Sequence, residues 1–341
     1  MTASFKIVTG RPDAELAAAW SACVSKWERA TPFIGPEFLV DKRNSGLNPF
    51  AILAINGDAV RGVLTGTNVD GRALIGIECR PQVYIERDAP AWVSEQLVAG
   101  LQKYSSQGVK LVSVCSWDKM PVLAGEGYRE KSFGVPVTPI LLDLAKGTEQ
   151  LFKEFSATRR TRIRQAIRAK VLIDDMQPSD FDAYYQIYSE WCEMKGFRAQ
   201  ARDAHEELLR DRSDRLVLVA RHNGKVIGAS IFRFRLGGMM EYGANVSRRE
   251  ESAVHQNDVL IWEGIKRASD LGLRIFSTGA SHFFLQRFGG TTTCTYRYRL
   301  DKTFLRRYFM ADLAMDARSA IARSMPQSLK AMAKRVSPNK G

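Results

Sequence analysis

Two stretches of ten residues decide the fold of this chain: residues 54–63 read AINGDAVRGV and residues 220–229 read ARHNGKVIGA. Each contains an Asn-Gly pair between apolar runs, which is typical of a tight β-hairpin turn. The two stretches align with one residue inserted in the first copy. Residues 107–114 (QGVKLVSV) and 271–278 (LGLRIFST) repeat in the same way. The offsets, 166 and 164 residues, are too wide for a solenoid and predict two copies of one domain; chance similarity is the alternative.

Strand-like and helical patterns alternate in the same order in both copies. The first copy is expected to contain a helix over 12–29, strands over 49–56, 59–66 and 72–79, a helix over 91–106, and strands over 109–114 and 136–144, the last closing the unit. The second copy is expected to contain a helix around 181–192, strands over 216–221, 225–235 and 239–247, a helix over 258–271 and a strand over 273–277. The pattern predicts an α/β fold with mixed sheets, divided into 1–150, 151–300 and a tail over 301–341.

The composition excludes several classes of protein. Of 341 residues, 45% are hydrophobic and 26% are charged, as in a soluble globular protein. The chain contains no run of 18 apolar residues, so no membrane-spanning helix is predicted. It also has no apolar segment near its start, so no signal peptide is predicted. Five cysteines, with no C-x-x-C pair, indicate neither a disulfide framework nor a zinc site. These features predict a cytoplasmic protein without a metal, with peripheral membrane contact left open.

The positive charge lies entirely in the second half of the chain. Residues 1–150 contain 16 basic and 16 acidic residues, so the net charge of +13 belongs to residues 151–341. Six cations fall within twelve residues: Arg159, Arg160, Arg162, Arg164, Arg168 and Lys170. Positions 160, 164 and 168 share one face of a helix and could bind phosphates through their guanidinium groups. We expect phosphate binding by Arg159, Arg160, Arg164 and Arg168; a solvated helix face is the alternative.

Three segments of the second half carry a family resemblance: L151-FKEFSATRRTRIRQAIRAKVLI, E241-YGANVS and F283-FLQRFGGTTTCTYRYRL. The chain resembles the FemAB-related N-acyltransferases, which include the Fem-type aminoacyltransferases of peptidoglycan cross-bridge synthesis. The resemblance implies two tandem GNAT-like domains and a C-terminal helix. It also implies amide formation from aminoacyl-tRNA and an amine acceptor. Where the family commonly places lysine after phenylalanine, this chain has Phe284-Leu285, so that lysine's role is not transferred.

The resemblance implies a donor site in and after the strand over 239–247. In a GNAT-like sheet the backbone of this splayed strand polarises the acyl carbonyl. Acetyl-CoA enzymes then have a glycine-rich loop that cradles the pyrophosphate. Here the connection reads R248-REESAVHQN and has no glycine, which disfavours standard CoA binding. The expected donor- and carbonyl-binding residues are Gly243, Ala244, Asn245, Gln256 and Asn257.

Three residues are candidates for catalysis, and His282 and Tyr242 each have a structural alternative. His282 could take the proton of an attacking ammonium as general base, or be a structural histidine. Tyr242 could act as an acid or as a stacking ring, or belong to the core. Arg287 could substitute for the missing family lysine.

The tail predicts a basic amphipathic helix. Leu305, Phe309, Leu313, Ala317, Ile321 and Met325 recur every four residues, and nine basic but only two acidic residues follow from Lys302 on. Such a helix over 304–325 could lie on an anionic membrane, flank RNA, or pack on the body of the protein. Residues 330–341 are expected to be disordered.

The sequence thus predicts an N-acyltransferase with no bound cofactor that transfers an aminoacyl group from aminoacyl-tRNA. The expected acceptor is an amine-bearing small molecule, a peptide or a cell-envelope precursor. Two alternatives remain open. One is an N-acyltransferase that uses acyl-CoA or acyl carrier protein, and the other is a non-catalytic GNAT-like protein that binds RNA or a membrane.

Overall fold

The computed structural model describes residues 3–324, with side chains up to residue 317. The first sheet holds β1 (Ala3–Val8), β2 (Pro49–Asn56), β3 (Ala59–Val69), β4 (Arg72–Ile75), β5 (Val83–Ile85), β6 (Leu111–Ser116), β7 (Arg129–Phe133) and β15 (Thr295–Asp301). The second sheet holds β8 (Ile140–Asp143), β9 (Leu172–Asp175), β10 (Arg215–His222), β11 (Lys225–Phe234), β12 (Met239–Ser247), β13 (Ile275–Ser277) and β14 (Thr291–Thr292). Each sheet with its helices is called a unit below. The expected disordered end, 330–341, lies outside the described residues.

Helices cover both faces of each sheet. They are α1 (Ala14–Val24), α2 (Trp92–Ser105), α3 (Pro121–Gly125), α4 (Thr148–Glu154), α5 (Ala157–Arg168), α6 (Phe181–Lys195), α7 (Arg202–Arg210), α8 (Gln256–Asp270), α9 (Phe283–Gln286) and α10 (Arg307–Ser324). Successive residues of β10 point to opposite faces, because side chains alternate along a strand. Leu218 and Ala220 join the core beneath α5 and α8, whereas Val217 and Val219 pack toward α6 and α7. Strand β2 divides its side chains in the same way between α2 and α1.

The two units repeat each other at a constant offset in their hairpins. Ala54 pairs with Gly62 in the first unit, and Ala220 pairs with Gly228 in the second. A register shift follows each of these alanines, and each hairpin closes over a two-residue loop, at 57–58 and 223–224. The predicted duplication is present, but the predicted insertion of one residue is wrong. The Asn-Gly pairs mislead because they occupy positions that differ by one residue within the two turns.

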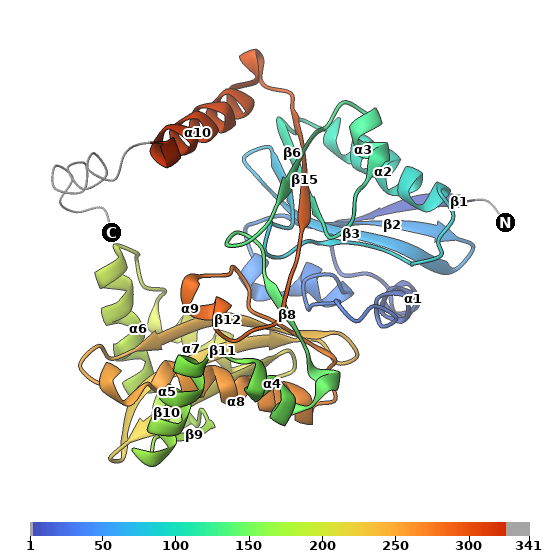
Figure 1. Cartoon of the computed structure of the whole chain (residues 1–341). Helices are drawn as coiled ribbons and strands as arrows, with labels where there is room; N and C mark the ends of the chain where they lie inside the picture. The colour runs from blue at the N-terminus through green and yellow to red at the C-terminus, as the bar shows by residue number, and fades with distance from the viewer. Residues whose placement is uncertain (1–2, 325–341) are drawn as a thin grey trace.

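The two units exchange their last strands. Strand β8 lies between β13 and β14 in the second sheet, and β15 lies between β6 and β7 in the first. Figure 1 shows β15 crossing from the second unit to the first. The prediction that residues 136–144 close the first unit is therefore wrong. The apolar run of β8 indicates a buried strand, but such a run fits the interior of either sheet and does not name its neighbours.

Candidate active site

A gap opens in the second sheet between β12 and β13. These strands pair in parallel only from Met239–Glu241 and Ile275–Ser277, after which β12 continues to Ser247 without β13. Gly243 is an extra residue in β12, since Tyr242 pairs with Phe232 and Ala244 with the preceding Ile231. The bulge leaves Gly243 and Ala244 exposed. Exposed strand backbone beside such a gap can hold and polarise a carbonyl group.

The chain after β13 touches β12 at the base of this gap. Gly279 has φ +65°, and a Cβ added there would lie 2.8 Å from the carbonyl oxygen of Tyr242. A side chain would therefore collide with the backbone of β12. The close approach places the segment that leads to His282 next to Tyr242 and the bulge.

The same place in the first unit is filled by the chain itself. Strand β4 ends at Ile75, earlier than the predicted strand over 72–79, because Gly76 takes φ +70° and turns the chain back. The chain then returns between β3 and β6. The N–H of Gln82 donates to the carbonyl of Cys115 in β6 at 3.3 Å, and the carbonyl of Gln82 accepts from the N–H of Thr65 in β3 at 3.1 Å. Gln82 is buried between the two strands. The candidate site therefore lies in the second unit.

The predicted catalytic residues lie on β12 and at the two ends of α9, which follows β13. Burial raises the pKa of Tyr242, whose ring packs edge-on against Phe232, so its hydroxyl is protonated at neutral pH. His282 is exposed and immediately precedes α9. Arg287 follows α9, with its guanidinium 4.4 Å from the ring centre of Phe283, which is 70% exposed. The structure thus brings His282 and Arg287 to the two ends of one short helix.

Three of the predicted donor residues use their amide N–H groups to hold the chain. Asn245 Nδ2 donates to Ser230 Oγ at 2.7 Å, and Asn257 Nδ2 donates to Ser247 Oγ at 3.1 Å. The buried Gln256 donates to the carbonyl of Arg248 at 3.1 Å. The bonds of Gln256 and Asn257 tie the start of α8 to the end of β12 and the residue after it, whereas the bond of Asn245 ties β12 to β11. They position the connection, while Gly243 and Ala244 provide exposed backbone.

The connection between β12 and α8 follows an unusual path for a loop without glycine. His255, just before α8, takes φ +57°, a left-handed conformation that glycine adopts more readily. Val254 packs against the core, and α8 begins without a hydrogen bond from a capping side chain. Burial, together with the positive charges of Arg162 and Arg159, lowers the pKa of His255. Arg162 therefore lies near the start of α8, and its position apart from the predicted arginine face explains why the sequence did not single it out.

The predicted phosphate-binding arginines do not form one row. Arg159 is 1% exposed, forms an ion pair with Asp258 in the first turn of α8, and donates to the carbonyl of Phe284 at 2.8 Å. Burial lowers the pKa of Arg159 to about 10. The expectation that it contacts phosphate is therefore corrected, because its guanidinium is enclosed and paired.

The other arginines of α5 divide into one that is engaged and two that face solvent. Arg160 donates to the backbone carbonyls of Lys153 and Phe155, so it caps α4 rather than facing a ligand. Arg164 and Arg168 are exposed, and the guanidinium of Arg164 lies 5.3 Å from the ring centre of Phe152. Only these two members of the predicted set present free surface charge.

A buried ion pair joins the units beneath the gap. Arg80 Nε donates to Glu241 Oε1 at 2.8 Å and to Oε2 at 3.0 Å. The side chain of Glu241 is 1% exposed and sits at the last paired position of β12 before the gap. The guanidinium of Arg80 also lies 4.1 Å from the ring centre of Phe33. No motif in the sequence links Arg80 to Glu241, because the pair depends on how the two units meet.

The sequence of the second unit matches a known protein family. Residues 154–288 match the family described as acetyltransferase (GNAT) domain. The matched segment runs through the second unit, from the end of α4 to the residues just after α9. No curated protein sequence matches the chain significantly. The predicted class of enzyme, an acyltransferase, is confirmed by this family.

Solved structures show the same tandem arrangement. FemX is 10% identical with a TM-score of 0.67, covering 87% of this chain and 98% of FemX. A tandem GNAT protein from the clavulanic acid biosynthesis pathway is 14% identical with a TM-score of 0.57, covering 89% of this chain and 99% of that one. The lysylphosphatidylglycerol synthetase L-PGS from Bacillus licheniformis is 14% identical with a TM-score of 0.56, covering 92% and 99%. At these identities the similarity shows the fold, and the predicted pair of GNAT-like domains is confirmed.

Three further properties concern residues 3–324 alone. None of their helices is both long and apolar enough to cross a membrane. Their His, Cys, Asp and Glu side chains form no group of three or more that could hold a metal ion. All five cysteines are free.

Proposed function

We propose that this GNAT-type N-acyltransferase takes an aminoacyl group from aminoacyl-tRNA and joins it to an amine acceptor in the gap between β12 and β13. The observation that carries the choice of donor is the connection over 248–255. It leads from the gap to α8 without a glycine, and His255 and Val254 stand where a pyrophosphate would need close access to backbone. A carrier that approaches from outside, with only its acyl end in the gap, avoids that requirement.

The residues around the gap support a direct transfer. The acceptor nitrogen attacks the ester carbonyl carbon, and a C–N bond replaces the C–O bond to the terminal ribose. The exposed backbone at Gly243 and Ala244 polarises the carbonyl, His282 takes the proton of the attacking amine, and protonated Tyr242 donates a proton to the departing oxygen. No covalent intermediate with the protein is required. Arg287 is placed to interact with a negative group near His282.

The charge distribution supports a polyanionic donor. The second half carries the whole net charge of +13, and Arg164 and Arg168 face solvent on α5. Arg162 lies close to the uncapped start of α8, where backbone N–H groups and the helix dipole favour an anion. We infer that phosphates of the donor bind along a path from the start of α8 to Arg164 and Arg168 on the exposed face of α5.

An acyl-CoA donor is the second candidate, and two observations favour it. The uncapped start of α8 could bind a single phosphate. The tandem GNAT protein of clavulanic acid biosynthesis is described in a form without AcCoA, which points to that ligand for that protein. A non-catalytic protein that binds RNA is the remaining candidate and predicts binding without turnover.

The experiment that tests the proposal is a donor screen. Protein freed of nucleic acid is incubated with charged tRNA, uncharged tRNA and acyl-CoAs at one fixed salt concentration, with a panel of amine acceptors. Binding is measured by filter retention, and amide products are measured by mass spectrometry. The variant Ala244→Phe, which fills the gap, is the inactive control, and Ala145→Phe, an exposed alanine in the η3 turn after β8 (Leu144–Lys146), is its matched control.

Preferential binding of charged over uncharged tRNA, with an amide product that Ala244→Phe abolishes, is the expected result. Transfer from acyl-CoA, with equal binding of charged and uncharged tRNA, would show that the donor is acyl-CoA and not aminoacyl-tRNA. Salt-sensitive RNA binding without any product would exclude catalysis with this acceptor panel and favour the binding protein.

A further inference from the structure

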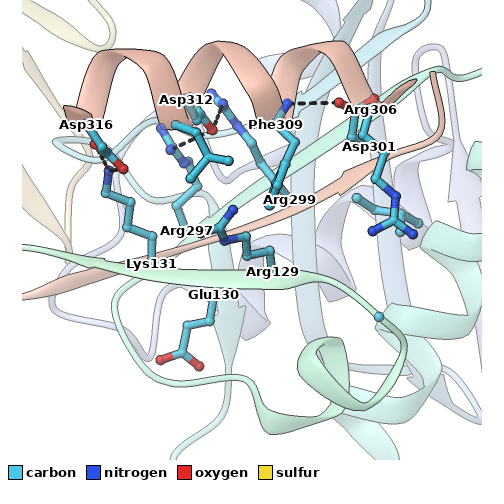
Figure 2. Close-up of a pocket in the computed structure, with 13 residues that line it drawn as sticks. Arg129, Glu130, Lys131, Arg297, Arg299, Asp301, Arg306, Phe309, Asp312 and Asp316 are labelled. Carbon is cyan, nitrogen blue, oxygen red and sulfur yellow. Dashed lines mark hydrogen bonds and ion pairs between the residues drawn. The ribbon is translucent and has the colours of Figure 1, made fainter. Parts of the chain in front are cut away.

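The helix α10 turns both of its acidic residues toward the first sheet. Asp316 accepts from Lys131 Nζ at 2.6 and 2.8 Å, and Asp312 accepts from Arg297 Nη2 at 3.3 Å and pairs with Arg299. Figure 2 shows these side chains pointing from the helix to β7 and β15 across a cavity of about 320 Å³. Phe309, whose ring centre lies 4.0 Å from the guanidinium of Arg129, also faces this side with Leu313, so these two members of the predicted apolar stripe face the body, whereas Leu305 does not.

The opposite side of α10 carries no acid over residues 307–317. By helical spacing it presents Arg307, Ala311 and Ala314, flanked by Met310 and Met315. Met310 is 57% exposed and Met315 is 58% exposed. Large apolar side chains beside arginine, without a neighbouring carboxylate, are unusual for a face that meets only water.

The turn before α10 presents two larger apolar side chains. In the 3-10 turn η6 (Phe304–Arg306), Phe304 is 89% exposed and Leu305 is 76% exposed, the highest values among large hydrophobic residues in the described chain. Leu305 and Arg306 have φ of +57° and +46°, a left-handed conformation that is costly for residues other than glycine. The fold keeps a strained turn that directs apolar side chains outward. Such strain is typical of sites that contact a ligand.

We propose that η6 and the outer face of α10 bind the surface of an anionic lipid bilayer. A bilayer offers apolar chains to Phe304, Leu305, Met310 and Met315 and anionic headgroups to arginine, which matches the composition of this face. Figure 1 shows α10 at the periphery of the molecule, where it can lie flat on an extended surface.

The charge of the face distinguishes a bilayer from the other occupants. A second copy of the chain would bring arginine against arginine without a carboxylate on either side, which disfavours a symmetric dimer here. Nucleic acid would satisfy Arg307 but leave the exposed phenylalanine and leucine in water. Of these three occupants, only the lipid surface satisfies both kinds of side chain.

The test measures partition of the full chain onto vesicles. Vesicles of phosphatidylcholine alone are compared with vesicles in which a third of the lipid is phosphatidylglycerol, by co-sedimentation at fixed salt. The double variant Phe304→Glu/Leu305→Glu should partition onto the anionic vesicles at least tenfold more weakly than the unaltered chain. The matched control Phe197→Glu/Leu236→Glu makes the same two changes at sites 61% and 63% exposed, so net charge and the basic tail are identical in both variants.

The expected result is preference for anionic vesicles that only the η6 variant loses. Equal partition of the two variants would overturn the proposal and assign vesicle binding to general charge or to the tail. Absence of preference for phosphatidylglycerol would overturn it as well. A concentration-dependent dimer that the η6 variant abolishes, without vesicle binding, would show that a second copy occupies this face. Thermal unfolding of both variants confirms that the fold is intact.

Discussion

The two units share one topology, but only the second has an open gap. Both have the same hairpin with the same bulge after alanine, and both receive their last inner strand from the other unit. In the first unit Gln82 occupies the space between β3 and β6, whereas in the second β12 and β13 diverge beside exposed Gly243 and Ala244. The first unit is also neutral and lacks histidine, while the second carries the charge and all four histidines. The two copies of the domain therefore differ in that the first is closed and the second has an open gap.

The strand exchange explains how the closed unit still contributes. Each sheet is completed by a strand of the other, so neither sheet is complete without the whole chain. The Arg80–Glu241 pair then fixes a loop of the closed unit against the strand that borders the gap. The first unit thus supports the strand that borders the candidate site in the second.

The largest effect is expected from breaking this support. Arg80→Ala leaves Glu241 buried without its partner, which costs about 3–5 kcal/mol for an uncompensated buried charge. Arg235→Ala, which removes a pair with the more exposed Glu37 across the same interface, should cost only about 0–1 kcal/mol. Urea unfolding measures both. Equal losses would show that the two contacts do not differ in kind, and Arg80→Met/Glu241→Met should recover most of the loss.

The next effect concerns the open gap itself. Ala244→Phe places an aromatic ring in the space beside the bulge and should lower kcat/KM about 100-fold, roughly 2.7 kcal/mol of transition-state stabilisation. Because Ala244 is exposed, the midpoint of thermal unfolding should be unchanged. Ala145→Phe, at the end of β8 remote from the gap, should retain full activity. Full activity of Ala244→Phe would move the site away from β12.

Acid should destabilise the second unit through His205. Burial lowers the pKa of His205 to about 4, and its ring nitrogens are engaged by the Tyr184 hydroxyl at 2.8 Å and by Gln200 Oε1 at 3.0 Å. Between about pH 6.5 and pH 4 the unfolded chain binds a proton that the folded chain does not, so stability falls as the pH falls. The free energy of unfolding should drop by about 2 kcal/mol from pH 7 to pH 5.

A replacement at His205 isolates this contribution. His205→Gln, although less stable at pH 7, should lose less stability than the unaltered chain between pH 7 and pH 5. His222→Gln serves as the control, because His222 lies at the hairpin turn and is less enclosed. Parallel pH profiles for the unaltered chain and His205→Gln would contradict a buried neutral imidazole.

The sequence predicted the parts of the fold that depend on local pattern. The hairpins at 54–63 and 220–229, the helix before β13 and the GNAT-like strand at 239–247 all follow from turn residues, periodicity and resemblance. The strand exchange could not be predicted, because the apolar run of β8 fits the interior of either sheet. Gln82 gave no signal either, since its role depends on the distance between two strands in space.

The arginines of α5 show the same limit within the candidate site. In the sequence, Arg159 looks like its neighbours Arg160 and Arg164. Its burial is set by Asp258, which lies far along the chain and meets it only after α5 packs on α8. Charge density therefore predicted a basic element correctly but not which of its members face solvent.

The smallest expected effect tests whether the exposed members bind the donor. Arg164→Glu/Arg168→Glu should raise the KM for the donor about tenfold, equivalent to about 1.4 kcal/mol, with kcat little changed, because phosphate contacts hold ground state and transition state alike. Arg11→Glu/Arg87→Glu makes the same change in net charge at exposed sites of the neutral first unit and should leave KM within about twofold. The slope of the logarithm of donor affinity against the logarithm of salt concentration should also become shallower by about 1–2 in the α5 variant alone. Each phosphate contact that is lost means that fewer counterions are released when the donor binds. If both double variants weaken donor binding equally, the overall charge and not the surface of α5 attracts the donor, and the functional difference between the two units is then confined to the gap.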